Sequence, residues 1–341
     1  MRIAIVNDSP IAVEALRRSL GFKTGLKIAW TATTGAEGVA KAQADTPDLV
    51  LMDLIMPGMD GVEATRRIMA NSPCAILVVT ASIGAQSSRV FEAMGHGALD
   101  AVDTPELGLG EDRAAAETLL RKIATIGRLI GDKVPRLASV AGIRKHPGSP
   151  LLAIGASSGG PAALAKLLAG LPGDLPAPVL IVQHIDQQFA AGMAEWLKQY
   201  SPWPVTVAQE GEHPEPGKVL LAGTADHLVF KSPERVGYTA EPVAAVHRPS
   251  VDVFFDSCNR HWRGDIYAVL LTGMGRDGAR AMKALRDKGH YTVAQDQVTS
   301  AVYGMPKAAA ELGAAVEVLA LEQIAPRLGR LVAGEGWRKA R

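Results

Sequence analysis

The chain has 341 residues, of which 48% are apolar and 21% charged, and its formal net charge at pH 7 is +1. A chain of this length usually folds into about two domains, and this composition excludes a largely disordered protein. Two cysteines exclude a disulfide scaffold and a cysteine-based zinc cluster. The near-zero charge argues against nucleic acid as a partner, and no apolar run is long enough to cross a bilayer. We therefore expect a soluble, cytoplasmic, two-domain protein.

The first third of the chain alternates short β-rich runs with segments of helical periodicity. Strands are expected at residues 3–6, 27–30, 49–52, 76–79 and 98–102, and helices at 11–20, 35–44, 61–70 and 111–130. Strands that alternate with helices form βαβ units and a parallel sheet. Residues 1–125 are therefore predicted to form a doubly wound α/β domain with a flavodoxin-like, five-stranded parallel sheet. We place a linker at residues 126–147, because periodicity is lost around Pro135, Gly142 and Pro147.

The alternation restarts at residue 151. Strands are expected at 151–154, 179–182, 219–222 and 268–271, and helices at 161–171, 188–199, 278–288 and 306–312. Residues 148–341 are therefore predicted to form a second doubly wound α/β domain.

Two carboxylates and a hydroxyl follow the predicted strands of the first domain. Asp8 comes after the first strand, Asp53 after the third, and Thr80 ends the fourth. In an open α/β sheet, side chains beyond the carboxyl ends of the strands converge on one crevice. Carboxylate and carbonyl oxygens with water suit Mg²⁺, and a metal there would offset the charge of a phosphoryl group attacked by Asp53. The alternative is that the aspartates only cap helices or form turns.

At these residues the first domain resembles the receiver domain of response regulators. The string Leu-Met-Asp-Leu-Ile-Met-Pro at residues 51–57 is among the most specific features of that family. The resemblance implies a two-component phosphoprotein in which a histidine kinase phosphorylates Asp53. It also implies that Asp8, Asp53 and the backbone carbonyl of Ile55 hold Mg²⁺, and that Thr80 is the switch residue that senses the phosphoryl group.

The first domain departs from the receiver pattern at two positions. Asn7 stands where the family usually has a second acidic residue, and Thr104 stands where it has a lysine before a proline. The lost carboxylate and the lost cation imply weaker metal binding, slower phosphotransfer or altered dephosphorylation.

A glycine-rich turn opens the second domain between a predicted strand and a predicted helix. Residues 155–159 read Gly-Ala-Ser-Ser-Gly, which fits both a phosphate-binding turn and the G-x-S-x-G pattern of a nucleophilic serine. His184 and Asp277 each follow another predicted strand, so they meet Ser157 if these strands are neighbours. The three residues would then form a Ser–His–Asp triad.

Simpler roles exist for each member of this set. His184 could be a capping or surface histidine, and Asp277 could cap the helix expected from residue 278. The chain order is serine, histidine, aspartate, whereas α/β-hydrolases run serine, acid, histidine. The other histidines of the domain show no metal-binding spacing and are expected in surface or core roles: His213, His227, His247, His261 and His290.

The second domain resembles the catalytic domain of CheB-type protein-glutamate methylesterases of bacterial chemosensory pathways. The motifs that carry the resemblance lie at residues 154–160, 182–184, 247–252, 271–278, 294–296 and 303–306. The resemblance implies that Ser157 is the nucleophile, that His184 is the general base and then acid, and that Asp277 orients His184. It also implies an oxyanion-hole N–H from Met274 and a nearby hydroxyl from Ser158, and such donors are typically worth about 3 kcal/mol.

The two resemblances together imply a phosphorylation-regulated serine carboxylic-ester hydrolase. Its substrate would be glutamate methyl esters on the cytoplasmic helices of a chemoreceptor, its phosphodonor a histidine kinase, and its result adaptation in a chemotaxis-type signalling pathway. The same acyl-enzyme would allow glutamine deamidation, and the esterase would need no cofactor. The alternative is a non-enzymatic response regulator whose second domain binds a partner. Neither nucleic-acid binding nor membrane insertion is expected.

Three features are similar to the Wsp-type branch of these proteins, which regulates a surface-sensing pathway. They are the pair Asn7-Asp8, the missing lysine at Thr104, and the string at residues 95–100.

Overall fold

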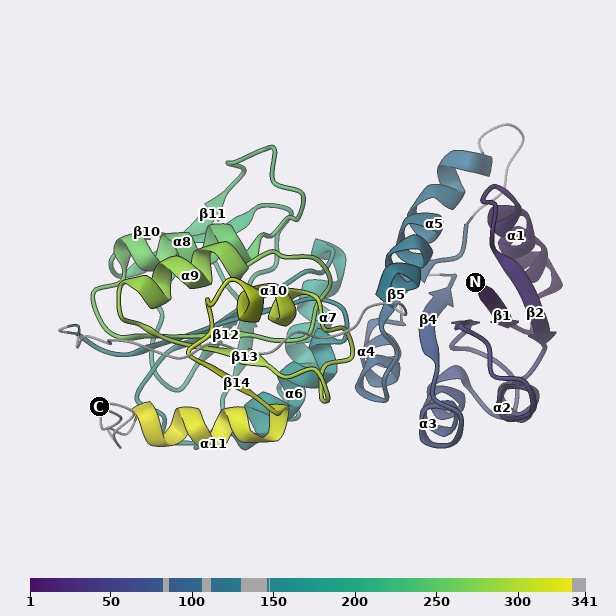
Figure 1. Cartoon of the computed structure of the whole chain (residues 1–341), viewed down its shortest axis with the longest axis horizontal. Coiled ribbons are helices and arrows are strands. Elements are labelled where there is room, and N and C mark those ends of the chain that lie inside the picture. The colour runs from purple at the N-terminus through teal and green to yellow at the C-terminus, as the bar shows by residue number, and fades with distance from the viewer. Residues whose placement is uncertain (82–85, 106–111, 130–145, 147, 333–341) are drawn as a thin grey trace. The chain divides into compact units, whose positions relative to one another are not determined.

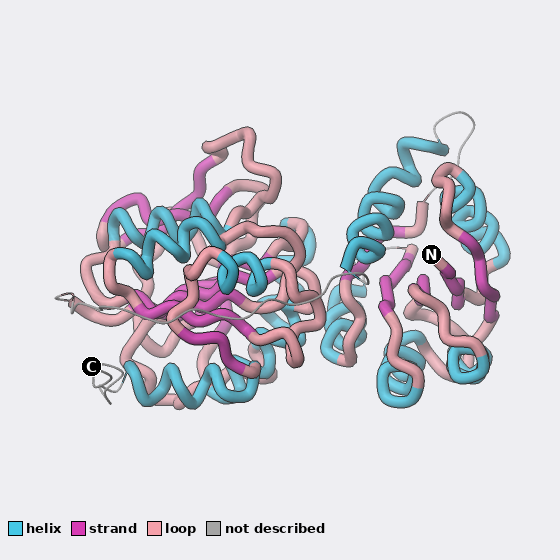
Figure 2. The backbone as a smooth tube through the Cα atoms, in the orientation of Figure 1, coloured by secondary structure: helices cyan, strands magenta, loops and turns pink. Residues whose placement is uncertain are grey.

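The computed structural model describes residues 1–81, 86–105, 112–129, 146 and 148–332 (Figures 1 and 2). The chain divides into two compact units, Met1–Lys133 and Val134–Arg341. Most of the expected linker lies outside the described residues, whereas residues 126–129 belong to a helix that ends at Leu129. Within the described ranges, no helix is both long and apolar enough to span a bilayer.

The first unit is a parallel sheet with the strand order β2-β1-β3-β4-β5. Helices α1 and α5 pack together on one face, and α2, α3 and α4 on the other (Figure 1). This arrangement confirms the predicted doubly wound fold. The elements are β1 (Arg2–Val6), α1 (Pro10–Gly21), β2 (Lys27–Ala32), α2 (Gly35–Ala44), β3 (Leu49–Met52), α3 (Gly61–Asn71), β4 (Ala75–Thr80), α4 (Ser87–Gly95), β5 (Asp100–Asp103) and α5 (Asp112–Leu129).

Capping side chains explain which helices of this unit the sequence reveals. Ser9, Thr34 and Asp60 each accept a backbone N–H at the start of α1, α2 and α3, as N-cap residues do. Helix α4 is not expected from the sequence pattern, and Gln86 before it makes no capping hydrogen bond. The capping role considered for Asp8 and Asp53 therefore belongs to other residues.

The second unit contains seven parallel strands in the order β14-β13-β12-β6-β7-β9-β8, and a separate antiparallel hairpin, β10-β11. Helices α8, α9 and α10 lie on one side of the large sheet, and α6, α7 and α11 on the other (Figure 1). The elements are β6 (Leu151–Ala156), α6 (Gly160–Gly170), β7 (Val179–Gln183), α7 (Gln187–Leu197), β8 (Val205–Val207), β9 (Val219–Leu221), β10 (His227–Ser232), β11 (Arg235–Thr239), α8 (Val251–His261), β12 (Ile266–Leu270), α9 (Ala279–Asp287), β13 (Tyr291–Gln295), α10 (Met305–Glu311), β14 (Glu317–Leu319) and α11 (Leu321–Val332).

Helix α8 is not predicted from the sequence pattern, although it contributes to both the core and the site of the second unit. It buries Phe254, Phe255 and Cys258 in the core that also holds Phe230 of the hairpin. Its first five residues are two valines, two phenylalanines and Asp252, and short apolar runs of that type do not distinguish helix from strand. Packing against the β10-β11 hairpin, which is a long-range contact, therefore helps determine its structure.

Burial gives His290 a strong influence on the pH dependence of stability. His290 lies directly before β13, accepts the backbone N–H of Ile266 on Nδ1 at 3.2 Å, and stacks on His146 with ring centroids 4.1 Å apart. Burial, together with His146, lowers its pKa from 6.5 to about 4. The unfolded chain therefore binds this proton more readily than the folded one, so stability is complete above pH 6.5 and falls toward pH 4.

We expect this group alone to remove about 2–3 kcal/mol of stability as the pH falls through that window. Hydrogen exchange of the β12 and β13 amides, followed from pH 7 downward, measures the effect. His290→Gln keeps an oxygen to accept the Ile266 N–H and removes the titrating group, so its stability should fall less steeply. Equal slopes in the two proteins would contradict the assignment.

Candidate functional site

Three neighbouring strands of the second unit bring the serine, histidine and aspartate to one edge of the sheet. The central strand order is β12-β6-β7. Ser157 follows β6, His184 follows β7, and Asp277 lies in the loop between β12 and α9. Strands β6 and β7 end level with each other, because Ala156 pairs with Gln183 in the parallel register. The strand that carries Ser157 therefore lies between the strands that precede the other two residues.

Backbone hydrogen bonds and close packing fix the turn that carries Ser157. The Ser157 N–H donates to the Thr272 carbonyl at 3.0 Å. Gly159, with φ of 74°, begins α6 in the left-handed region, which favours glycine. Gly273 approaches so closely that a Cβ there would lie 2.7 Å from the Ser157 Cβ. No non-glycine residue in the described ranges has a positive φ, so Ser157 does not occupy the strained turn typical of α/β-hydrolases.

The three side chains form a continuous hydrogen-bonded series. His184 Nδ1 lies 3.1 Å from Ser157 Oγ, and His184 Nε2 lies 2.7 Å from an Asp277 carboxylate oxygen. The side chains of His184 and Asp277 are only 10% and 9% exposed, and hydrogen bonds strengthen where water is excluded. These distances are those of a nucleophile with its base and of a base with the group that orients it.

Asp277 is held by the N-terminus of α8. Its carboxylate accepts the backbone N–H groups of Val251 at 2.7 Å and Asp252 at 3.0 Å. The Ser250 hydroxyl donates to it at 2.8 Å. The helix that follows Asp277 in sequence, α9, is capped by Gly278 instead. Asp277 is therefore bound to the helix N-terminus of another segment, where a negative charge is stabilised.

The protonation of the triad follows from the environment of Asp277. Burial alone would raise the pKa of this carboxyl, but the hydrogen bond and charge of His184 and the backbone donors of α8 outweigh burial and keep the pKa below its usual value. An ionised Asp277 fixes the proton of His184 on Nε2. The lone pair of Nδ1 is then free to accept the Ser157 hydroxyl proton.

The Ser250 hydroxyl has two functions in this arrangement, since it donates to Asp277 and accepts the Val253 N–H at 3.3 Å as the N-cap of α8. We expect Ser250→Ala to lower the free energy of unfolding by about 1 kcal/mol. We also expect it to slow ester hydrolysis about tenfold, as the loss of one hydrogen bond to a charged group would. Ser250→Thr, which keeps the hydroxyl, should restore both quantities. Wild-type unfolding and wild-type rates in the alanine variant would contradict this role.

Two backbone N–H groups beside Ser157, those of Ser158 and Met274, donate no hydrogen bond within the described residues. Met274 directly follows Gly273, whose backbone lies against Ser157. Oxyanion holes are commonly built from the N–H of the residue after the nucleophile and one further backbone N–H. The Ser158 carbonyl is fixed by the Thr272 hydroxyl at 2.9 Å. The roles of Met274 and Ser158 toward an oxyanion stay predictions.

The structure adds two residues to the site that spacing alone does not single out. His247, expected in a surface or core role, stacks on His184 with ring centroids 4.2 Å apart. The buried Gln183 donates its amide to the Ser157 carbonyl at 2.9 Å. Both residues lie inside strings that carry the resemblance to methylesterases. Membership of those strings was therefore the signal that could have found them.

In the first unit, β1, β3 and β4 are neighbours and bring Asp8, Asp53 and Thr80 to one sheet edge. Asp53 is half-buried and accepts the Leu54 N–H at 2.8 Å. Burial, with a smaller contribution from the charge of Asp8, raises the pKa of Asp53 to about 6. The Thr80 hydroxyl donates to the Gln86 side chain at 3.1 Å. A cation would suit this site, because it would offset the negative charges of two neighbouring carboxylates.

The donor set of this edge fits Mg²⁺. Among the residues that the structure describes, no three acidic, histidine or cysteine side chains gather as a metal site. Mg²⁺ needs no such cluster, because it typically takes one or two carboxylates and keeps several waters. Asp8 and Asp53 would supply the carboxylates, and the Ile55 carbonyl is an additional candidate ligand. The buried Asn7 accepts the Ser9 N–H at 2.8 Å and so shapes the turn into α1.

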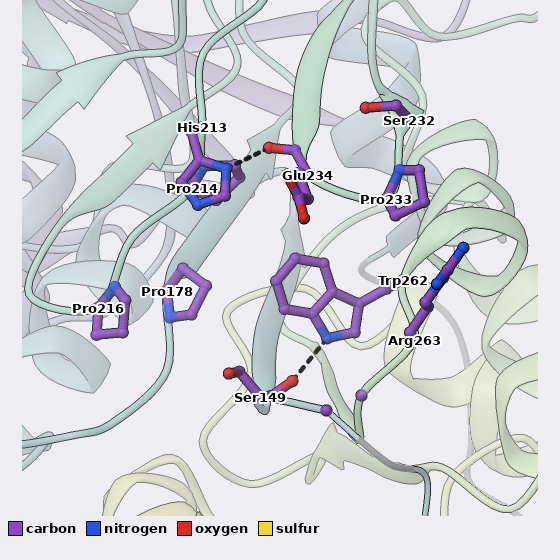
Figure 3. A pocket seen from close by; sticks show the side chains of 12 residues that line it. Ser149, Pro178, His213, Pro214, Pro216, Ser232, Pro233, Glu234, Trp262 and Arg263 are labelled. Atoms are coloured by element: carbon purple, nitrogen blue, oxygen red, sulfur yellow. Dashed lines mark hydrogen bonds between the residues drawn. The ribbon is translucent and has the colours of Figure 1, made fainter.

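A hollow lies at the opposite edge of the large sheet (Figure 3). Several of its residues lie just before the start of a strand, among them Ser149, two residues before β6, and Pro178, which directly precedes β7. Trp262 donates its indole N–H to the Ser149 carbonyl at 2.9 Å, and prolines form much of the wall (Figure 3). Because the triad follows the strands that these residues precede, the hollow is separate from the triad.

Comparison with known proteins gives the family. Residues 152–328 match the CheB methylesterase family, and residues 3–106 match the response regulator receiver domain. The chain is 58% identical over 330 residues to protein-glutamate methylesterase/protein-glutamine glutaminase 3 of Pseudomonas savastanoi pv. phaseolicola, which covers 96% of this chain and 98% of the relative. It is 59% identical over 329 residues to protein-glutamate methylesterase/protein-glutamine glutaminase 2 of Cupriavidus metallidurans, which covers 96% and 97%.

A solved structure is similar to the second unit. The crystal structure of the Thermotoga maritima CheB methylesterase catalytic domain has 33% sequence identity and a TM-score of 0.52, and the match covers 54% of this chain and 99% of that one. The receiver match in the first third and the methylesterase match in the remainder agree with the two sheets and their sites. The chain therefore belongs to the CheB methylesterase family and carries a response regulator receiver domain ahead of its catalytic domain.

Proposed function

We propose that the chain is a phosphorylation-controlled serine esterase that hydrolyses glutamate γ-methyl esters on a chemoreceptor. The observation that carries the proposal is the hydrogen-bonded series Ser157–His184–Asp277 in a chain whose relatives are named protein-glutamate methylesterases. Those names also include glutaminase activity, so we extend the proposal to receptor glutamines. The enzyme acts in the cytoplasm, on the cytoplasmic helices of the receptor.

In the acylation step, Ser157 Oγ attacks the ester carbonyl carbon, and the serine proton passes to His184 Nδ1. The N–H groups of Ser158 and Met274 donate to the oxyanion of the tetrahedral intermediate. Collapse breaks the bond to the methoxy group, which takes the proton from His184 and leaves as methanol. The glutamyl group is then esterified to Ser157.

In the deacylation step, water attacks the glutamyl ester and gives a proton to His184. The proton returns to Ser157 Oγ as the serine leaves, and the receptor keeps a glutamate carboxylate. Asp277 stabilises the imidazolium of His184 in both steps and is not itself protonated. A glutamine side chain would enter the same sequence, with ammonia as the leaving group in place of methanol.

The receiver unit supplies the control. A histidine kinase phosphorylates Asp53. Asp8, Asp53 and the Ile55 carbonyl would hold Mg²⁺, which would offset the charge of the phosphoryl group when bound. The Thr80 hydroxyl, which donates to Gln86 in this structure, is the group that senses the phosphoryl oxygen. The unphosphorylated receiver restrains the esterase, and phosphorylation relieves the restraint.

The proposal is tested on membranes that contain a chemoreceptor with radiolabelled methyl esters. The intact protein should release labelled methanol, and a small-molecule phosphodonor with Mg²⁺ should accelerate the release. Receptor binding without any release would favour the alternative, a non-enzymatic regulator.

Asp53→Asn removes the carboxylate that accepts the phosphoryl group. We expect this variant to keep the unstimulated rate of methanol release and to lose the acceleration by acetyl phosphate and Mg²⁺. Asp48→Asn, which keeps an oxygen to accept the backbone N–H of Arg2 as Asp48 does, is the matched control and should retain the acceleration. Stimulation that survives in Asp53→Asn would place the phosphorylation elsewhere.

A further inference from the structure

One face of the His184 imidazole is covered by a second imidazole. The rings of His184 and His247 have centroids 4.2 Å apart and planes that differ by 13°. The segment of residues 247–252 that carries His247 also carries the three donors to Asp277. One short stretch of chain therefore contacts both the catalytic ring and the carboxylate that orients it.

The two hydrogen bonds of His184 do not fix its ring completely. The hydrogen bonds to Ser157 and Asp277 are both made at the edge of the ring. The ring can therefore still tilt about the line from Ser157 Oγ to the Asp277 carboxylate oxygen. Such a tilt changes the angle at which Nδ1 meets the Cβ–Oγ bond of Ser157, and hydrogen bonds weaken steeply as they bend. A flat group packed against the ring face opposes this tilt, because closely packed atoms leave no space for it.

His247 is well held for this purpose. The adjacent Arg248 donates from its guanidinium to the Ala240 carbonyl at 2.9 Å and lies 3.9 Å from an Asp226 carboxylate oxygen. The loop that carries Met274 is also close to His247, because a Cβ on Gly275 would lie 3.9 Å from His247 Nε2. His247 is thus close both to His184 and to the backbone of that loop.

The charge of His247 is compatible with the chemistry. Burial, and then the neighbouring His184, lower the pKa of His247, while Asp277 acts in the opposite direction. His247 is therefore uncharged near neutral pH and does not oppose the positive charge that develops on His184. Its ring makes no hydrogen bond to another described residue, so its planar face is what His184 meets.

We propose that His247 is a positioning residue, whose ring holds the imidazole of His184 in the plane that joins Ser157 to Asp277. The inference rests on the proposed function only in taking His184 as the base of Ser157. It requires a flat ring and not a ring nitrogen. An aromatic substitute should therefore keep the function, and a non-planar side chain of similar bulk should lose it.

The test measures Ser157 reactivity in the intact protein with a fluorophosphonate, which needs no receptor. The Ser157 Oγ–P bond forms, the P–F bond breaks, fluoride leaves, and the serine proton passes to His184. We expect His247→Phe to react within about threefold of the wild type, and His247→Leu to react roughly ten- to hundredfold more slowly, as small misplacements of reacting groups do. His247→Gln is a second non-aromatic variant in case the leucine variant misfolds.

The control and the second readout separate positioning from general stability. His261→Leu alters a half-buried histidine at the other end of α8 and should leave the reactivity unchanged. The second readout is the NMR signal of the His184 Nε2 proton in ¹⁵N-histidine-labelled protein. This signal should stay sharp in wild type and His247→Phe, and it should broaden in His247→Leu and His247→Gln.

Two results would overturn the inference. Equal loss in His247→Phe and His247→Leu would show that the ring nitrogens act in the chemistry, and full reactivity with an ordered His184 in His247→Leu would show that stacking is unnecessary. Failure of the proposed function is distinct, because it would appear as a reactive Ser157 in a protein that releases no methanol from the receptor.

Discussion

Ser157→Ala is expected to lower methanol release from a methylated chemoreceptor by about 10³- to 10⁶-fold, to the limit of detection. The variant removes the hydroxyl oxygen that we propose carries the glutamyl group, while His184 and Asp277 keep their own hydrogen bond of 2.7 Å. Water would then have to attack the ester directly, with a base positioned for a different nucleophile. Initial rates of labelled methanol release by the wild type and the variant measure the effect.

Ser232→Ala is the matched control for this result. Ser232 lies in the wall of the hollow at the opposite sheet edge (Figure 3), so its hydroxyl is far from the strand ends that carry the triad. The control should retain the wild-type rate, and both variants should keep the wild-type unfolding curve. Substantial release by a folded Ser157→Ala would show that another group performs the hydrolysis.

Asp277→Asn is expected to lower the rate by about 10⁴-fold, because the neutral amide no longer holds His184 in the reactive tautomer. The carboxylate accepts hydrogen bonds from His184, Ser250 and the backbone at residues 251–252. An asparagine has one accepting oxygen and an amino group that donates. Either the asparagine amino group faces another hydrogen-bond donor, or His184 adopts the tautomer that carries its proton on Nδ1, facing Ser157. We therefore expect a loss of rate together with a lower free energy of unfolding.

Asp256→Asn provides the comparison within the same region. Asp256 lies on α8, is 32% exposed, and forms an ion pair with Arg280. Exposed ion pairs usually contribute at most about 1 kcal/mol, so this variant should keep the rate and almost all of the stability. A rate for Asp277→Asn within about tenfold of the wild type would contradict the orienting role that we assign to Asp277.

The sequence predicts the triad because its members follow strands. A glycine-rich turn after β6 and a polar residue after β7 are local features, and a parallel sheet brings the ends of neighbouring strands together. The strand order, which makes β12, β6 and β7 neighbours, is a tertiary property that the pattern alone leaves open. The same reasoning holds for Asp8, Asp53 and Thr80 in the first unit.

The support for the triad could not be predicted in the same way. The Asp277 carboxylate accepts hydrogen bonds from the start of a helix that lies more than twenty residues earlier in the chain. His247 contacts His184 from the loop before that helix. The sequence pattern also does not predict helix α8, because its apolar residues pack against a hairpin that is distant in sequence. Gln86, which binds Thr80, likewise carries no local signal. Such contacts arise only once the elements pack.

The central claim is that Ser157 carries the glutamyl group as an ester, and partition of that intermediate tests it most directly. Hydroxylamine added during turnover competes with water for a glutamyl ester and yields a receptor hydroxamate. The enzyme-dependent ratio of hydroxamate to glutamate, after subtraction of the Ser157→Ala background, should be the same from methyl ester and from glutamine substrates, because both pass through one acyl-enzyme. Methanol release with no enzyme-dependent hydroxamate would contradict the account.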